Sequence, residues 1–157
     1  MTEAASATEG RIHEFTTQSG ADTIAVGRKL AALLKPPQLL ILRGELGTGK
    51  TTLVKGIAEA LDAAEAEEVT SPTFTLLHEY DGAWKGKPIK LCHIDVYRLE
   101  GERQLEALGL DDLLTSNALV LVEWGEKFKS IRKRATGEIA IVAAGGDART
   151  ITVTLKE

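Results

Sequence analysis

Cysteine is almost absent from this chain, which has only Cys92 among its 157 residues. A single cysteine excludes an internal disulfide framework and any metal site built from several thiolates. Free cysteine is among the most frequently buried residue types, so we expect Cys92 to be a buried thiol. Unpaired cysteine is typical of a reducing compartment, and we therefore expect a cytoplasmic protein.

Long apolar runs and excess positive charge are also missing. No run approaches the roughly 18 residues of a membrane-spanning segment, so we expect no contact with a membrane. Residues 1–10, MTEAASATEG, have neither the basic nor the apolar part of a signal peptide and are predicted to be a disordered lead-in. The formal net charge of −4 gives no general attraction to nucleic acid, so contact with RNA would have to be local or pass through a partner.

Strand-like and helix-like segments alternate along the rest of the chain. Short apolar runs bounded by glycine, proline or polar residues favour strands, and apolar residues at helical spacing favour helices. The predicted strands cover 11–19, 38–44, 73–82, 87–95 and 118–124, and the predicted helices cover 21–34, 51–63, 102–114 (interrupted near Gly109) and 126–133. The segment 137–157 predicts two further strands around the turn Gly145-Gly146-Asp147.

A glycine-rich turn between the second strand and the second helix carries the strongest motif. Residues 44–51, GELGTGKT, match the phosphate-binding pattern G-x-x-x-x-G-K-[ST] in full. The predicted nucleotide-binding residues are Gly44, Glu45, Leu46, Gly47, Thr48, Gly49, Lys50, Thr51 and the following Thr52. A chance match is improbable, because a buried strand precedes the loop and a helix follows it, as the chemistry requires.

Each fixed position of this loop has a chemical reason. Glycines permit unusual dihedral angles and close approach of the backbone, so that consecutive N–H groups can surround the phosphates. The N-terminus of the following helix adds its unpaired N–H groups and its dipole. The ammonium group of Lys50 is positioned for the β- and γ-phosphates, and the Thr51 hydroxyl supplies a hard oxygen ligand for Mg²⁺. We therefore predict ATP and Mg²⁺ as cofactors.

Two carboxylates stand at the ends of predicted strands. Glu123 ends the apolar run ALVLVE, and Asp95 ends KLCHID. Residues at the carboxyl ends of strands line the ligand crevice in open α/β sheets, so both are candidates for catalysis and Glu123 for binding the metal. The alternative is that each is a solvated residue. His93 lies on the same side as Asp95, and a lone histidine is more often structural than catalytic.

The segment Ser71-Pro72-Thr73-Phe74 lies about twenty residues beyond the loop. Nucleotide-dependent switches use such a segment when a threonine hydroxyl senses the γ-phosphate and its metal ion. The alternative is an ordinary proline-containing turn into a strand.

Taken together, GELGTGKTTL, SPTFTLLHEY, HIDVYRL and VEWGEK resemble the TsaE (YjeE) family. The likeness runs from the first strand to about Lys133. The alternation of strands and helices, with the phosphate-binding motif, predicts an α/β fold of the P-loop NTPase type. It has three α/β/α layers in a single domain over residues 11–157, a mainly parallel central sheet and antiparallel additions at the C-terminus. The resemblance implies an ATPase that acts with TsaB and TsaD in the threonylcarbamoylation of adenosine 37 in ANN-decoding tRNAs, with the tRNA contacted through the complex.

The resemblance also implies roles for single residues. Thr73 belongs to a switch-like loop, Asp95 matters for hydrolysis, Glu123 is associated with Mg²⁺, and Thr23 in the first helix approaches the nucleotide. Trp124 is a family position as well, although it also suits a packed aromatic anchor. Where many members have proline after the Glu-Trp pair, this chain has glycine, which makes the following loop less predictable.

Two other functional classes stay open at this point. A small-molecule kinase would need an acceptor site and usually an arginine-bearing lid, for which Arg98, Arg103, Arg132 and Arg134 are available. A non-catalytic nucleotide sensor would bind but not hydrolyse. The chain is short, and little remains beyond the phosphate-binding machinery for a second substrate pocket, which favours a regulatory hydrolase. No N-K-x-D guanine motif is present, which favours ATP over GTP.

Overall fold

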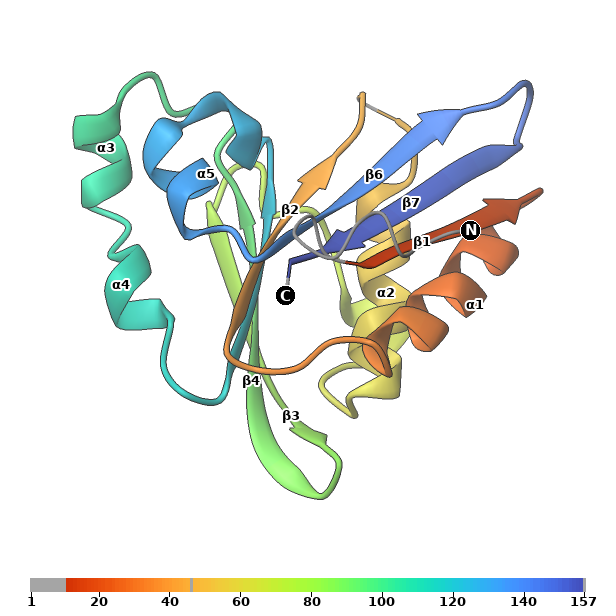
Figure 1. The fold of residues 1–157 in the computed structure, drawn as a ribbon, viewed down its shortest axis with the longest axis horizontal. Helices are drawn as coiled ribbons and strands as arrows, with labels where there is room; N and C mark the ends of the chain where they lie inside the picture. Colours follow the sequence, from red (N-terminus) through yellow and green to blue (C-terminus); the bar gives the residue numbers. More distant parts are fainter. Residues whose placement is uncertain (1–10, 46, 157) are drawn as a thin grey trace.

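The computed structural model describes residues 11–45 and 47–156, which form one sheet with helices on both of its faces (Figure 1). The predicted lead-in, residues 1–10, and one predicted loop residue, Leu46, lie outside the described residues. The strands are β1 (Arg11–Thr17), β2 (Gln38–Arg43), β3 (Leu77–Trp84), β4 (Lys87–Asp95), β5 (Ala118–Glu123), β6 (Gly137–Ala143) and β7 (Arg149–Leu155). The helices are α1 (Gly20–Ala31), α2 (Lys50–Ala60), α3 (Glu102–Glu106), α4 (Leu110–Leu113) and α5 (Lys129–Arg134), with short 3-10 turns η2 (Ala66–Glu68) and η3 (Gly125–Lys127).

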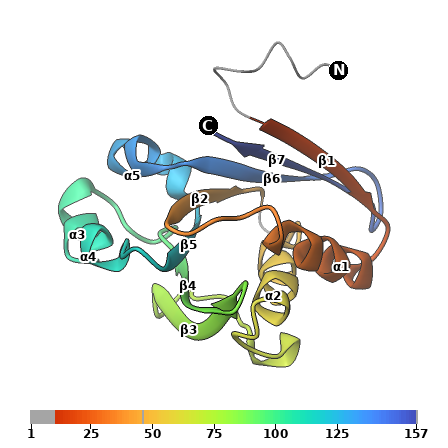
Figure 2. The ribbon, with the colours of Figure 1, turned by 60° about the horizontal axis from the view of Figure 1, so that its bottom comes forward.

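The sheet is mixed, and the prediction of a mainly parallel sheet holds only for its centre, where β6, β2, β5 and β4 run parallel. Its strand order is β1-β7-β6-β2-β5-β4-β3, so β1 and β3 form opposite edges (Figure 2). The pairs β2–β5, β2–β6 and β4–β5 are parallel, whereas β1–β7, β6–β7 and β3–β4 are antiparallel. The antiparallel C-terminal addition is confirmed, but β1 and the β3–β4 hairpin add antiparallel pairs elsewhere. In that hairpin Lys85 and Gly86 both have positive φ, which suits a tight two-residue turn.

Two hydrophobic cores flank the sheet and make the predicted layering of an α/β fold. One lies between the sheet and helices α1 and α2, with Leu30, Leu53 and Leu121 among its fully buried members. The other lies between the opposite face and helices α3, α4 and α5, and includes Val122 and Ile131. Alternate residues of β4 and β5 enter opposite cores, because side chains along a strand point to opposite faces. A functional side chain at the end of either strand therefore has a definite face.

Several helix and strand boundaries differ from the predicted ones, and the reasons can be identified. The helix predicted over 102–114 is interrupted by Gly109, as expected, and this glycine has φ of 71°. The strand predicted from residue 73 begins only at Leu77, because Leu76 adopts φ of 71° and its N–H bonds to the carbonyl of Pro72 in a turn. The strand predicted to end at Trp124 ends one residue earlier, since Trp124 has φ of 66°. Leu76 precedes β3 and Trp124 follows β5, so both residues with positive φ lie on the side of the sheet where β4 and β5 end.

Helices α1 and α2 cross in close contact through two glycines. An added Cβ at Gly27 would overlap the carbonyl oxygen of Leu53, and one at Gly56 would overlap that of Ile24. The N-terminus of α1 is fixed by Ser19, whose hydroxyl accepts a hydrogen bond from the N–H of Asp22 at 3.1 Å. The glycine contact and the cap together set the position of α1 against the start of α2.

Cys92 is fully buried on β4, as predicted, and burial raises the pKa of its thiol to about 11 from 9.0. We expect the folded protein to react very slowly with a thiol-specific reagent, and the denatured protein to react at once. Because the folded pKa lies above the unfolded one, the buried thiol contributes stability that is complete below pH 9.0 and is lost as the pH rises through about 11. Rapid labelling of the native protein at neutral pH would contradict this expectation.

Across the described parts of the chain, no helix combines the length and the apolar character that crossing a membrane requires.

Candidate functional site

The glycine-rich loop connects β2 to α2 on the side of the sheet where the carboxyl ends of the parallel strands lie. Gly47 and Gly49 have φ of 80° and 107°, values that glycine adopts without strain. Thr48 closes the loop by donating its hydroxyl hydrogen to the carbonyl of Glu45 at 2.8 Å. Gly49 is the N-cap of α2, and it offers no side chain to the N–H groups of the first turn. The start of α2 therefore presents unpaired backbone donors to any anion held by the loop.

Lys50 is the first residue of α2, and it is 6% exposed. Its ammonium group donates to the carbonyl oxygen of Gly44 and lies 4.1 Å from the centre of the Trp124 ring. Burial lowers the pKa of Lys50, and the nearby charges of Glu123 and Asp95 oppose that shift. A cation desolvated in this way gains interaction energy when an anion enters the loop. The lysine of the motif is thus positioned for an anionic ligand.

The two predicted carboxylates are neighbours. Asp95 at the end of β4 is paired in register with Glu123 at the end of β5, and each is 3% exposed. Both lie on the face that α2 covers. The hydroxyl of Thr51 donates to Oε2 of Glu123 over 3.4 Å, and the Nε2 atom of His93 lies 2.6 Å from that same oxygen. The structure therefore brings Lys50, Thr51, Asp95 and Glu123 together from positions far apart in the sequence.

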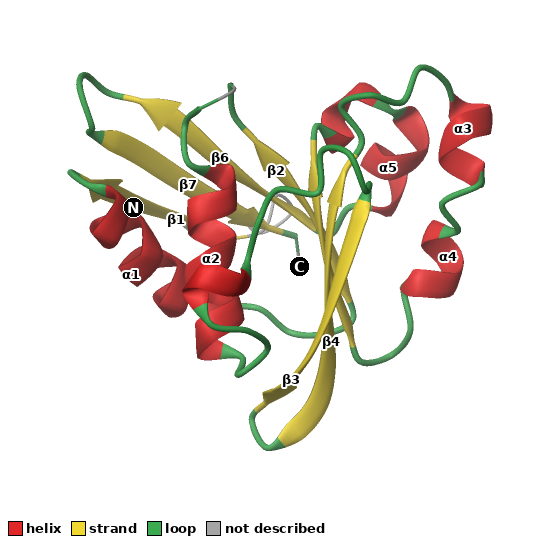
Figure 3. Cartoon of the chain, turned by 180° about the vertical axis from the view of Figure 1, so that it is seen from behind, coloured by secondary structure: helices red, strands yellow, loops and turns green. Residues whose placement is uncertain are grey.

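Thr73 contacts the site from the loop between α2 and β3. Figure 3 shows this loop returning to the end of the sheet at which α2 begins. The Thr73 hydroxyl donates to Oδ2 of Asp95 at 3.1 Å, and the Ser71 hydroxyl lies 2.6 Å from that of Thr73. The other oxygen of Asp95, Oδ1, accepts from the N–H of Tyr97 at 2.8 Å. One carboxylate therefore holds two chain segments, one on each oxygen.

The same loop is attached to α2 further along. The ammonium group of Lys55 donates to the carbonyls of Ala66 at 2.8 Å and Val69 at 2.7 Å. These bonds fix the chain just before Ser71.

Thr23 and Thr52 line a small cavity of about 160 Å³ beside the glycine-rich loop, together with Arg149. Thr23 is buried, and its hydroxyl bonds to the hydroxyl of Thr17 and to the carbonyl of Ser19, both at 3.2 Å. This places Thr23 next to the loop, and its approach to the nucleotide stays a prediction. Its hydroxyl, however, already has two partners within the protein.

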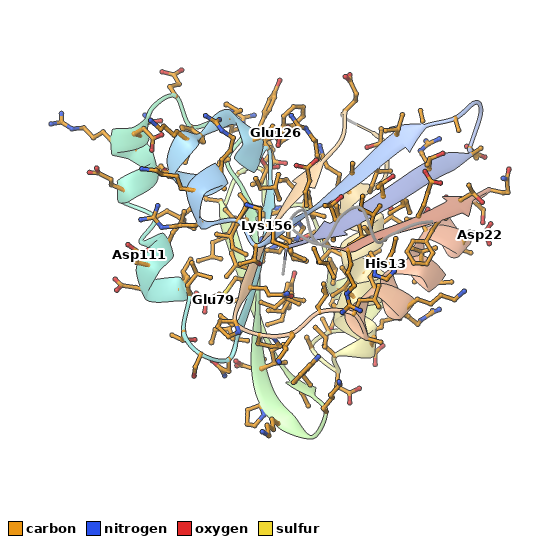
Figure 4. The ribbon with its side chains drawn as sticks, viewed as in Figure 1. His13, Asp22, Glu79, Asp111, Glu126 and Lys156 are labelled. Carbon is orange, nitrogen blue, oxygen red and sulfur yellow. The ribbon has the colours of Figure 1, made fainter. Side chains whose placement is uncertain are left out.

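Arg149, at the start of β7, was not predicted as a site residue. Its Nε atom donates to the carbonyl of Thr48 at 2.9 Å, so the C-terminal hairpin contacts the glycine-rich loop. Arg149 also lines a larger cavity of about 650 Å³, between that loop, Trp124, Glu126 and the end of β6. Figure 4 labels Glu126 in the upper part of the view, beside the upper end of β2. No local pattern indicates such a role, because the contact joins residues about a hundred positions apart.

A separate cavity of about 410 Å³ lies among α3, α4 and α5, away from the loop. Four of its polar side chains bond in pairs: Arg134 bonds to both carboxylate oxygens of Asp111, at 2.8 and 3.0 Å, and the hydroxyl of Ser130 donates to Glu102 at 2.6 Å. Figure 4 shows Asp111 on α4. Because these groups are already engaged with one another, this cavity is a weaker candidate for a site than the loop.

The donors around the loop fit Mg²⁺ bound together with phosphate. Thr51, Asp95 and Glu123 offer hard oxygen atoms, which Mg²⁺ prefers. Over residues 11–45 and 47–156, no group of three or more His, Cys, Asp or Glu side chains could hold a metal ion alone. Magnesium commonly binds through one or two carboxylates plus phosphate oxygens and water, so the sparse protein ligand set is consistent with a metal that arrives with its nucleotide.

Comparisons with known proteins agree with one another. The family model for the threonylcarbamoyl adenosine biosynthesis protein TsaE matches residues 17–151. The tRNA threonylcarbamoyladenosine biosynthesis protein TsaE of Bacillus subtilis is 40% identical over 142 residues, covering 90% of this chain and 84% of the relative. The protein of that name from Streptomyces coelicolor is 40% identical over 134 residues, covering 82% and 87%. The crystal structure of Bacillus subtilis YdiB matches with a TM-score of 0.68 and 33% identity, covering 94% of this chain and 88% of that one.

Proposed function

Because the chain belongs to the TsaE family of tRNA threonylcarbamoyladenosine biosynthesis proteins, we propose that it is a Mg²⁺-dependent ATPase with the P-loop NTPase fold. It supports the threonylcarbamoylation of adenosine 37 in ANN-decoding tRNAs and acts with TsaB and TsaD. The observation that carries this proposal is the buried Lys50 at the start of α2, held beside the paired carboxylates Asp95 and Glu123.

The triphosphate binds in the glycine-rich loop. The first-turn N–H groups of α2 and the N–H groups of the loop donate to the phosphate oxygens. Lys50 exchanges its bond to the neutral Gly44 carbonyl for bonds to phosphate oxygens, which carry the opposite charge to the ammonium group. Arg149 lies between the two cavities that flank the loop, and its guanidinium group adds positive charge beside the bound nucleotide.

Hydrolysis needs charge stabilisation and an oriented water molecule. Thr51 and Glu123 would hold a magnesium ion, which would supply positive charge to offset the charge on the phosphates. Asp95 stands beside Glu123 at the end of the neighbouring strand, where its carboxylate can orient the attacking water. Burial of both carboxylates keeps bulk water from screening these interactions.

The loop that carries Thr73 reports which nucleotide is bound. Thr73 donates to Asp95 in the free protein. A γ-phosphate with its metal ion offers that hydroxyl a different acceptor, so the loop has two alternative attachments. A nucleotide changes affinity for a partner only through contacts that differ between two such states. ATP therefore favours one assembly with TsaB and TsaD, and hydrolysis resets it.

The direct test is ATP hydrolysis by the purified protein, alone and with TsaB and TsaD. We expect phosphate release that depends on Mg²⁺ and increases when both partners are present. Phosphate release that is absent in the full mixture, although ATP binds, would favour a non-catalytic nucleotide sensor. Transfer of phosphate to an added small acceptor would favour the kinase alternative.

The carboxylates allow a sharper prediction. We expect Asp95→Ala and Glu123→Ala to bind ATP, because the loop and Lys50 are intact, yet to block multiple-turnover tRNA modification. Glu123→Ala should bind ATP more weakly only when Mg²⁺ is present. Removing one group of a preorganised electrostatic site typically lowers kcat by about 10²–10³-fold. The matched control is Asp111→Ala, which removes an exposed carboxylate on α4 and should leave turnover unchanged. Normal turnover by both site variants would contradict the proposed function.

The kinase alternative gains little from the positions of its candidate arginines. Arg98 lies over the Phe74 ring at 4.3 Å, Arg132 donates to the carbonyl of Glu126 at 2.7 Å, and Arg134 pairs with Asp111. Neither these three nor Arg103 on α3 lines the cavities beside the glycine-rich loop. The described residues therefore offer no specific observation in favour of a kinase.

A further inference from the structure

His93 is the most deeply buried polar side chain near the loop. It is 0% exposed, and on β4 it lies two residues before Asp95, on the same face of the sheet. Its Nε2 atom is 2.6 Å from Oε2 of Glu123, which is the shortest contact made by that carboxylate. The pair is therefore buried and closely held.

The direction of this hydrogen bond follows from the two partners. A carboxylate oxygen can only accept, so Nε2 of His93 carries the hydrogen and donates it. The opposite ring nitrogen, Nδ1, is buried and has no partner among the described residues. A buried polar atom without a partner is unfavourable, and an apolar residue at position 93 would avoid it. Stability alone therefore does not explain a histidine here.

Among the described residues, both hydrogen bonds to the Glu123 carboxylate fall on one oxygen. His93 and Thr51 both donate to Oε2, while Oε1 accepts no hydrogen bond from any residue in the part of the chain that the structure describes. The Thr51 bond is long, at 3.4 Å, so His93 is the principal restraint on the carboxylate. Fixing one oxygen orients the plane of the carboxyl group and leaves the other oxygen available.

We propose that His93 is a positioning residue that holds Oε2 of Glu123 and so presents Oε1 to the magnesium ion of bound Mg·ATP. The role rests on the proposed function, since it requires that Glu123 bind the metal. Partners of metal ligands act in this way: they fix the orientation of the ligand, and losing one typically costs about 10–100-fold in metal affinity. His93 itself touches neither metal nor nucleotide.

Two amide variants provide a matched test. The side-chain nitrogen of glutamine in His93→Gln reaches about as far as Nε2 and keeps a donor to Glu123, whereas the shorter His93→Asn cannot reach it. Calorimetry measures the affinity for ATP in EDTA and in excess Mg²⁺ for both variants and for the wild type. We expect His93→Asn to lose roughly tenfold in affinity only when Mg²⁺ is present, and His93→Gln to stay close to the wild type.

The outcomes separate this role from a structural one and from failure of the proposed function. Equal losses in EDTA and in Mg²⁺ would show a structural role and overturn the inference, as would an unchanged His93→Asn. A wild type that binds no ATP, or binds it equally with and without Mg²⁺, would overturn the proposed function and this role with it. If His93→Asn does not fold, the imidazole ¹⁵N chemical shifts of the wild type test the role instead. A positioning role requires hydrogen on Nε2 and a larger change in these shifts on binding Mg·ADP than on binding metal-free ADP, and the absence of either overturns it.

Discussion

Lys50→Ala is expected to weaken binding of ATP about 100-fold, because one charge-assisted contact to the phosphates contributes up to about 3 kcal/mol. Hydrolysis should fall below detection, with or without TsaB and TsaD. The loss should be the same in EDTA and in Mg²⁺, since Lys50 contacts phosphate and not the metal. Calorimetry with ATP under both conditions measures it.

The same substitution should leave the free protein nearly as stable as before. Burial lowers the pKa of Lys50, so the charged side chain is less favourable in the folded state than in water. Removing it relieves that penalty, but the bond to the Gly44 carbonyl and the contact with Trp124 are lost as well. We expect the two effects to offset to within about 1 kcal/mol, which is a change of about 2–4 °C in melting temperature for a chain of this size.

Lys29→Ala serves as the control, because Lys29 is an exposed lysine in the last turn of α1. It should bind ATP like the wild type. If Lys50→Ala also binds ATP normally, the glycine-rich loop does not bind a triphosphate and the proposed function is wrong. If Lys50→Ala instead fails to fold, the buried ammonium group stabilises the protein more than its surroundings indicate.

Gly56→Ala is expected to lower the free energy of unfolding by about 3 kcal/mol or more, since overpacking between rigid elements costs about 1–3 kcal/mol and a backbone clash adds to it. The new Cβ would overlap the carbonyl oxygen of Ile24 and approach the backbone nitrogen of Arg28. Neither can rotate away as a side chain could, so α1 and α2 must separate. Denaturant unfolding measures the loss.

Gly20→Ala is the matched control, also a glycine in a helix of this pair. Nothing lies within 4 Å of an added Cβ at Gly20, and its φ is not in the left-handed region. Replacing glycine where its conformation suits alanine typically stabilises by about 0.4–1 kcal/mol. A Gly56→Ala protein as stable as the Gly20→Ala protein would show that the two helices have room to adjust.

Local patterns in the sequence were sufficient for most elements and for the loop. The apolar spacing and the flanking residues locate β4 over residues 87–95, and Gly145-Gly146-Asp147 forms the turn between β6 and β7 as predicted. Gly82 was predicted to end its strand, but β3 continues through it to Trp84. At Gly82 a side chain would overlap the carbonyl of Leu61, so a tertiary contact decides this glycine, and turn chemistry does not.

Local sequence patterns could not predict contacts between residues that are far apart in the chain. Strand order depends on which edges pair, and the antiparallel pairing of β1 with β7 joins the two ends of the described chain. In the same way, the bonds of Arg149 to Thr48 and of His93 to Glu123 need the folded sheet. The motif made Lys50 and Thr51 candidates, and the strand ends did the same for Asp95 and Glu123. The sequence placed His93 on the side of Asp95 but did not predict its bond to Glu123, and it gave no sign of Arg149.

The double attachment of Asp95 has a thermodynamic consequence. Its two oxygens hold Thr73 and the backbone of Tyr97, and each segment exposes an aromatic ring, with Phe74 81% and Tyr97 44% exposed. Suppose that nucleotide displaces Thr73 from Asp95. A molecule that binds Phe74 only when Thr73 is bonded to Asp95, or only when it is not, must then alter the affinity for nucleotide. Reciprocity then requires the nucleotide to alter the affinity for that molecule by the same factor. Titrating nucleotide with and without that molecule would give the factor for both ligands.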